Sequence, residues 1–99
     1  MNYIPLKDKE FSFIYLSREE CSVCHALLPK IKKLASDYPK GEFTHIDLDD
    51  HPLAAGEFMV FSIPALLVYS GGKELYRGAR FFNMKELKER LDRYYNSIF

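Results

Sequence analysis

The stretch FSFIYLSREECSVCHALLPK, residues 11–30, carries both cysteines of the chain and indicates how its first half folds. Its first six residues form a short apolar run rich in β-forming side chains, which is typical of a strand buried on both faces. Polar residues 17–20 end this run, and helical spacing of apolar residues begins at Ser22. Cys21 and Cys24 are therefore expected between a buried strand and the first turn of a helix.

The predicted helix runs from Ser22 to about Tyr38. Its apolar residues step by four, four, three and four positions, at Val23, Leu27, Ile31, Leu34 and Tyr38. Pro29 lies inside this segment and predicts a kink, because proline removes a helical hydrogen bond. The triplet at residues 39–41, Pro-Lys-Gly, is expected to end the helix.

The second half of the chain alternates between strand and helix signals. Residues 42–49 read as a strand with Thr44, Ile46 and Leu48 on one face, and residues 51–58 as a short helix. Residues 64–70 and the segment from Lys73 predict two further strands. Only Gly71-Gly72 separates them, which indicates a two-residue hairpin with positive φ.

A final helix is predicted after Asn83, a good N-cap residue. Its apolar stripe consists of Met84, Leu87, Leu91, Tyr94 and Ile98. The expected fold is α/β with the element order β-α-β-α-β-β-α, because a strand–helix–strand unit of this length forms a parallel pair. We expect a four-stranded mixed sheet flanked by helices, in one domain over residues 1–99.

Bulk composition limits the possible partners. The 99 residues are 47% hydrophobic and 28% charged, which is ordinary for a folded domain. Fourteen basic and fourteen acidic side chains give zero net charge, which argues against nucleic acid or an anionic membrane held by bulk charge. Neither a signal peptide nor an apolar run of about 20 residues is visible, so the expected location is the cytoplasm.

The cysteine pair can be interpreted in three ways. Residues 21–25, CSVCH, match the spacing of covalent haem attachment, and His45 and His51 add ligand types of a zinc site. Haem attachment is usual in exported proteins, and a mixed sheet is not the scaffold of a small cytochrome. A zinc finger has about twelve residues between its cysteine and histidine pairs, whereas twenty lie between Cys24 and His45. We therefore expect no metal and no bound cofactor.

The third interpretation, a redox dithiol, is favoured by the position of the pair. Cys21 is expected near the N-cap of its helix, where free backbone N–H groups and the helix dipole stabilise a thiolate. The thiolate is the nucleophile in disulfide exchange, so Cys21 is the candidate attacking residue. Cys24, one turn deeper on the same face, is the candidate resolving residue. Two incidental cysteines are the plain alternative.

The charges beside Cys21 oppose one another. The helix N-terminus and a protonated His25 favour the thiolate, whereas Glu19 and Glu20 disfavour it. Each exposed charge of this kind contributes about 0.3–1 kcal/mol. We therefore expect Cys21 to be only moderately acidic.

From about Phe11 to Tyr95 the chain resembles the thioredoxin family. The matching features are the C-x-x-C pair after a strand, a proline five residues beyond Cys24, and the segment SIPALLVYSGGKELYRGA, residues 62–79. The resemblance implies that the Ile63–Pro64 peptide bond is cis and faces the dithiol. It also implies that this neighbourhood offers backbone groups to an extended substrate segment. Ile63, Pro64 and Gly78 are therefore candidate substrate-binding residues.

The chain departs from the family pattern at several positions. Glu20 replaces a tryptophan, Ser22-Val23 replaces Gly-Pro, and the family's first strand and helix are truncated, with only residues 1–10 in their place. Tyr15 and His45 stand where the family has a buried Asp and its Lys partner. One expectation is that their polar tips lie close, directly or through one water, which would make His45 the candidate base for Cys24. The equal alternative is that Tyr15 is a core aromatic residue and His45 faces solvent at the edge of the sheet.

Exposed aromatic residues suggest a docking surface. Phe61 lies next to the cis-proline segment, and with Val60 and Phe81 it would form an apolar patch around the dithiol. For at least one of Phe81 and Phe82, packing against the last helix is the favoured alternative.

The expected function is that of a monomeric, cytoplasmic thiol–disulfide oxidoreductase in cell redox homeostasis. Its expected partners are disulfide-containing proteins or small thiols as substrates, and a reductase that the sequence does not identify. An interaction module with a slow or vestigial dithiol is the alternative.

Overall fold

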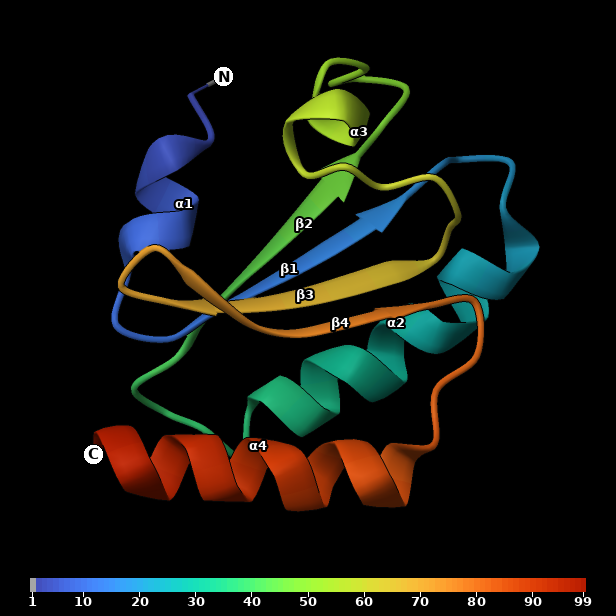
Figure 1. Ribbon diagram of the computed structural model, residues 1–99. Coiled ribbons are helices and arrows are strands. Elements are labelled where there is room, and N and C mark those ends of the chain that lie inside the picture. The colour runs from blue at the N-terminus through green and yellow to red at the C-terminus, as the bar shows by residue number, and fades with distance from the viewer. Residues whose placement is uncertain (1) are drawn as a thin grey trace.

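The structure, a computed structural model, describes residues 2–99 and contains four helices and four strands in that range (Figure 1). The elements are α1 (Ile4–Asp8), β1 (Ser12–Ser17), α2 (Ser22–Ala35), β2 (Glu42–Asp47), α3 (Ala54–Glu57), β3 (Ala65–Ser70), β4 (Lys73–Ala79) and α4 (Met84–Ile98). The expected order is confirmed, and the short helix α1 precedes it. No helix among residues 2–99 has the length and apolar character needed to cross a membrane.

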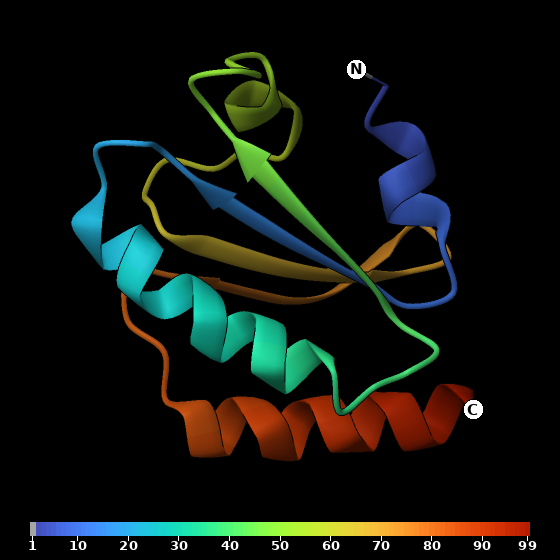
Figure 2. The same cartoon turned by 180° about the vertical axis from the view of Figure 1, so that it is seen from behind.

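The four strands form one mixed sheet in the order β2-β1-β3-β4. β1 pairs in parallel with β2 and antiparallel with β3, and β3 and β4 form an antiparallel hairpin. Both views show α2 and α4 on one face of the sheet, and α1 and α3 on the other (Figures 1 and 2). The expected architecture of a sheet flanked by helices is therefore confirmed.

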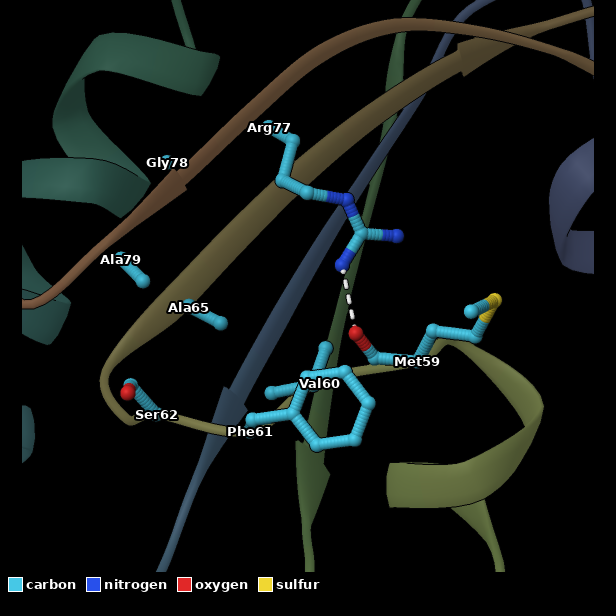
Figure 3. A pocket seen from close by; sticks show the side chains of 8 residues that line it. All are labelled: Met59, Val60, Phe61, Ser62, Ala65, Arg77, Gly78 and Ala79. Carbon is cyan, nitrogen blue, oxygen red and sulfur yellow. Dashed lines mark hydrogen bonds between the residues drawn. The ribbon is translucent and has the colours of Figure 1, made fainter.

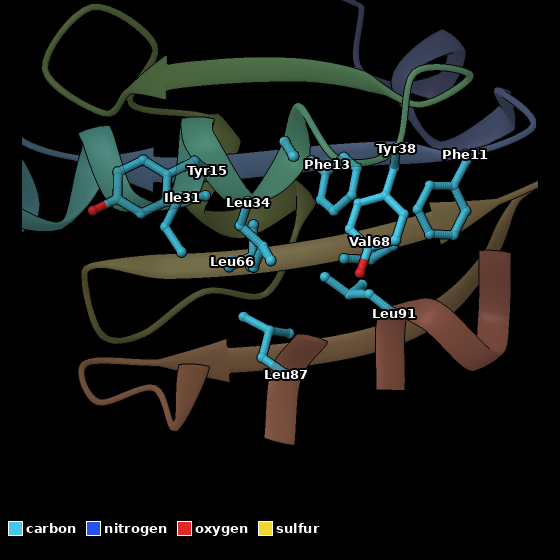
Figure 4. Close-up of a cluster of buried hydrophobic side chains, with 11 residues drawn as sticks. Phe11, Phe13, Tyr15, Ile31, Leu34, Tyr38, Leu66, Val68, Leu87 and Leu91 are labelled. Carbon is cyan, nitrogen blue, oxygen red and sulfur yellow. The ribbon is translucent and has the colours of Figure 1, made fainter. Parts of the chain in front are cut away.

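The central strand β1 is buried along its whole length, as its apolar run predicted. Phe13 and Tyr15 point into the core under α2 and α4, the first core, which Figure 4 shows. Ile14 and Leu16 point into the core under α1 and α3, the second core. Full burial of such a side chain contributes about 1.5–3 kcal/mol. The strand that leads to the dithiol is therefore held from both sides.

Helix α2 ends at Ala35, earlier than the apolar stripe suggested, although Tyr38 beyond it is buried. The hydroxyl of Tyr38 donates to Asp92 Oδ1 at 2.7 Å and so links this loop to α4. Val23, the first residue of the expected stripe, is 56% exposed. The spacing rule is wrong there because Cys24, and not Val23, is the residue of the first turn of α2 that packs against the sheet.

The local signals for the other elements agree with the structure. Gly71 and Gly72 have φ values of 55° and 85°, and join β3 to β4. Asn83 caps α4, with its Oδ1 accepting the backbone N–H of Glu86 at 3.1 Å. Of the expected α4 stripe, Leu87 and Leu91 are fully buried and Ile98 at the end is 38% exposed.

The N-terminal segment docks on the hairpin. The backbone N–H groups of Gly71 and Gly72 donate to the carbonyls of Lys9 and Lys7, each at 2.8 Å. Leu6 and Tyr3 pack against the second core. These contacts hold a helix that is too short to be stable alone.

The strand register gathers three chain segments at one end of the sheet. Leu16 near the end of β1 pairs with Ala65 at the start of β3, and Ala65 pairs with Ala79 at the end of β4. The loop after β1, the loop before β3 and the loop after β4 therefore meet at the edge where α2 begins.

Candidate active site

The two cysteines are bonded as a disulfide at the start of α2, with their Cα atoms 5.2 Å apart. Cys21 is the N-cap residue, and its Sγ accepts the backbone N–H of Cys24 at 3.2 Å. Cys21 is partly exposed, whereas Cys24 is 1% exposed and faces the sheet. The expected position of the pair between β1 and the first turn of a helix is confirmed.

The loop before Cys21 is tied to the end of β2. The side chain of Asp49 accepts the backbone N–H of Glu19 at 3.0 Å and forms an ion pair with Arg18 at 3.0 Å. The hydrogen bond from Glu19, assisted by Arg18, lowers the pKa of Asp49 below its usual value. This carboxylate therefore stays charged and keeps the loop in place.

His25 is exposed on the first turn of α2, and its Nε2 lies 2.6 Å from the carbonyl oxygen of Glu19. A carbonyl oxygen can only accept, so Nε2 carries a proton. His25 thereby closes the same loop from the other side, and it lies close to Cys21 in sequence, as Glu20 does.

Tyr15 lies directly beneath the dithiol. Its side chain is fully buried, and its hydroxyl donates to the backbone carbonyl of Cys24 at 2.8 Å. Burial raises the pKa of Tyr15 to about 12. The phenol is therefore protonated at neutral pH, so it is a hydrogen-bond donor to the first turn of α2 and not a base.

His45 stands opposite Tyr15 on β2, as the register of the parallel pair requires. The two rings lie 5.6 Å apart, but His45 Nε2 contacts the hydroxyl of Ser17 at 2.6 Å. Desolvation of the ring lowers the pKa of His45 from 6.5, partly offset by Asp47. The expected direct hydrogen bond between Tyr15 and His45 is wrong, because each group has another partner. Tyr15 consequently does not connect His45 to Cys24.

The Ile63–Pro64 peptide bond is cis, as the resemblance implied. Pro64 is buried, Ile63 is half-buried, and the carbonyl of Pro64 accepts the backbone N–H of Arg80 at 2.7 Å. This hydrogen bond fixes the loop before β3 to the turn after β4. Both segments lie at the dithiol end of the sheet.

The packing around residue 78 explains why it is a glycine, which the sequence did not indicate. A Cβ added there would collide with the hydroxyl of Tyr76 and come within 2.8 Å of the ring of Phe82. The absent side chain thus makes room for two aromatic rings that pack on the first core. This packing gives the glycine a structural role.

A shallow hollow of about 200 Å³ lies beside the cis-proline loop (Figure 3). Its lining residues are Met59, Val60, Phe61, Ser62, Ala65, Arg77, Gly78 and Ala79. Arg77 holds the loop by donating to the carbonyls of Met59 at 3.0 Å and Phe58 at 2.6 Å, and it pairs with Glu74 at 2.8 Å. No sequence motif pointed to Arg77, because both of its carbonyl partners come from a distant segment.

The expected apolar patch is partly wrong. Phe61 and Phe81 are 89% and 86% exposed, but Val60 is buried in the second core. Phe82 packs against the first core and is the aromatic residue that fastens the β4–α4 connection. Val23, between the cysteines, is the exposed apolar residue that the spacing rule assigned to the core instead.

Metal ligands do not gather at this site. Among residues 2–99, no group of three or more His, Cys, Asp and Glu side chains is arranged as an ion would require. The chemistry that the described side chains can supply is that of a buried and an accessible sulfur.

The comparisons with known proteins agree with this geometry. The thioredoxin family model matches residues 5–93. The thioredoxin-like protein YdfQ of Bacillus subtilis is 42% identical over 90 residues, which cover 91% of this chain and 80% of that protein. A thioredoxin of Staphylococcus haemolyticus is 33% identical, over 75% of this chain and 72% of that protein. The structure of thioredoxin 1 from Thermosipho africanus superposes with a TM-score of 0.77 at 29% identity, covering 86% of this chain and 94% of that one.

The fold and the disulfide at the start of α2 define a thiol–disulfide oxidoreductase, a class that acts on disulfide substrates and is re-reduced by a reductase. The chain belongs to the thioredoxin family.

Proposed function

We propose that Cys21 is the attacking nucleophile and Cys24 the resolving thiol of this oxidoreductase. The observation that carries the proposal is the asymmetry of the pair: Cys21 is partly exposed and its Sγ accepts the N–H of Cys24, while Cys24 is buried against the sheet. A helix N-cap sulfur that accepts a backbone N–H is stabilised as the thiolate.

In this reaction the Cys21 thiolate attacks one sulfur of a substrate disulfide. A Cys21–substrate disulfide forms, and the other substrate sulfur leaves as a thiolate. Cys24, after losing its proton to water or buffer, attacks the Cys21 sulfur and releases the second substrate thiolate. Two electrons pass to the substrate, and the oxidised Cys21–Cys24 pair then takes two electrons from a reductase.

We further propose that substrates contact the cis-proline loop. Ile63 and Pro64 lie beside the edge where α2 begins, and the exposed ring of Phe61 stands at the hollow next to them. Gly78, which lines the same hollow, is proposed as a further substrate-binding residue. Glu20 and His25 are proposed to tune the acidity of Cys21, and Tyr15 to position Cys24. His45, whose lowered pKa favours the neutral ring, is proposed as a base or as a modulator of the thiol pKa values.

The remaining expectations are also proposals. We propose that residues 1–99 form one domain that works as a monomer in the cytoplasm, in electron transfer for cell redox homeostasis. It needs no bound cofactor or metal. Nucleic acid and membranes are not among its partners, because the zero net charge gives no bulk electrostatic attraction to either. Its substrates are disulfide-containing proteins or small disulfides.

Insulin reduction with a chemical reductant tests the catalytic role. The protein should accelerate reduction, and Cys21→Ser should abolish the acceleration. Cys24→Ser should instead trap a mixed disulfide. Alkylation of the reduced protein should modify Cys21 much faster than Cys24. Equal labelling, or activity that survives Cys21→Ser, would exclude these roles.

A second candidate is an interaction module with a slow dithiol. The exposure of Phe61 and Phe81 favours it, because two large apolar rings beside a disulfide form a docking surface. A lack of insulin reduction, together with an ordinary redox potential for the pair, would support this candidate.

A further inference from the structure

Arg80 has a backbone conformation that arginine rarely adopts. Its φ is 69°, and the N–H of Phe81 donates to the carbonyl of Ala79 at 2.8 Å, which closes a three-residue turn around it. A turn with positive φ at its central residue is rare and strained for a residue with a Cβ, whereas glycine adopts it freely. Strained backbone conformations of this kind are concentrated at functional sites.

The other positive-φ residue shows what an ordinary structural cause looks like. Met59, with φ of 54°, follows α3 in a helix-ending motif: Val60 N–H donates to Ala55 O at 2.8 Å, and Met59 N–H donates to Gly56 O at 3.2 Å. That motif requires a left-handed residue after the helix. Arg80 follows a strand and not a helix, so no helix-ending motif requires its left-handed conformation.

Arg80 lies at the dithiol edge. Its N–H is bound to the carbonyl of Pro64, and the ends of β1, β3 and β4 coincide there. β4 is two strands away from β1, a distance of about 10 Å at ordinary strand spacing. The Arg80 side chain is exposed, and among residues 2–99 it makes no ion pair.

Charges of opposite sign flank the dithiol along this edge. On the β2 side, Glu19 and Glu20 are exposed and Glu19 is fastened to Asp49. On the β4 side stands Arg80. A substrate segment lying across the cis-proline loop would meet carboxylates at one end and a guanidinium at the other.

We propose that Arg80 is a specificity-determining residue that selects protein disulfides with an acidic side chain on the flank that crosses the end of β4. The inference rests on the proposed function, since it places the reacting substrate sulfur at Cys21. In this proposal, the strained backbone at residue 80 is tolerated because the arginine side chain puts a positive charge at this edge of the sheet. The exposed ring of Phe81 beside it offers apolar contact.

Short peptides test this proposal. Each carries one cysteine as a mixed disulfide with 5-thio-2-nitrobenzoate, and a Glu, Gln or Lys on either flank. Pre-reduced protein attacks through Cys21, the coloured thiolate leaves, and Cys24 then releases the peptide. On one flank, Glu should react about two- to fivefold faster than Lys at low ionic strength, and high salt should remove the difference.

The variants separate charge from structure. Arg80→Gly relieves the turn, so it should fold at least as well as the parent chain and lose the charge preference. Arg80→Glu should reverse the preference. Arg93→Glu, an equal charge change on the exposed side of α4, should leave it unchanged. Comparing the Glu-to-Lys rate ratio of each variant with that of the parent chain cancels the effect of the flank on the peptide's own thiol.

Equal rates for all flanks, or a preference that survives Arg80→Gly, would overturn the specificity role while leaving the dithiol chemistry intact. If no peptide releases the coloured thiolate faster with the parent chain than with Cys21→Ser, the proposed function itself fails.

Discussion

Replacing Tyr15 by phenylalanine removes one hydroxyl from the layer beneath the dithiol and leaves the buried ring in place. The lost hydrogen bond joins Tyr15 Oη to Cys24 O over 2.8 Å, and both groups are buried. A buried neutral hydrogen bond contributes about 0.5–1.5 kcal/mol net. The free energy of unfolding of the oxidised protein should therefore fall by about 1 kcal/mol, which lowers Tm by about 4–8 °C in a domain of this size.

Urea unfolding of the oxidised protein measures this change, with an unchanged m-value as the sign that the same surface unfolds. Tyr76→Phe is the matched control, because among residues 2–99 the Tyr76 hydroxyl has no hydrogen-bond partner. It should change stability by much less than Tyr15→Phe. Equal losses in the two variants, or no loss in Tyr15→Phe, would show that the bond to Cys24 contributes nothing.

The same variant distinguishes positioning from acid–base chemistry. With a pKa of about 12, Tyr15 stays protonated near neutral pH and cannot accept the Cys24 proton. Tyr15→Phe should therefore shift the rate of the resolving step without altering its pH profile between about pH 6 and 9. Loss of an ionisation from that profile would refute this reasoning.

Three other substitutions have expected outcomes. Glu20→Gln should lower the thiol pKa of Cys21, measured by thiolate absorbance in the reduced protein, because it removes a negative charge next to the sulfur; a rise would contradict the proposed tuning. Burial lowers the pKa of His45 below its unfolded value of 6.5, so the unfolded state takes up the proton first as pH falls. The stability contributed by neutral His45 is thus complete above about pH 6.5 and is lost as pH falls through the folded pKa. His45→Gln should therefore flatten the dependence of the urea-derived free energy of unfolding on pH in that range. An unchanged slope of that free energy against pH would exclude the effect. Gly78→Ala should destabilise the fold by about 1–3 kcal/mol, since the new methyl group must displace Tyr76 and Phe82; thermal unfolding measures this, and a neutral result would mean that both rings move freely.

Local sequence signals predicted the structure correctly where residues close in sequence determine it. The apolar run of β1, the Gly71-Gly72 hairpin and the Asn83 cap depend on residues close in sequence, and the structure confirms them. The position of Cys21 at a helix N-terminus is of the same kind, because the break after the strand and the helical spacing both lie within ten residues.

Expectations that required knowing what a side chain faces were less secure. Val23 continues the spacing of its helix but is exposed, and Val60 belongs to the second core although it stands next to exposed Phe61. Tyr15 and His45 lie opposite each other on β1 and β2, as the resemblance implied. Their hydrogen-bond partners depend on side-chain direction and on the path of α2, which no spacing rule contains.

The sequence by itself determined the order of the elements, the dithiol at the start of a helix and, through resemblance, the cis-proline loop that accompanies it. Only the tertiary structure decided that Tyr15 binds the carbonyl of Cys24, that Arg77 holds the loop before the cis proline, and that Arg80 takes a left-handed conformation at the rim. The reason is physical: periodicity and capping act over a few residues, whereas these contacts join side chains and backbone groups that approach each other only when the strands pair and the helices pack.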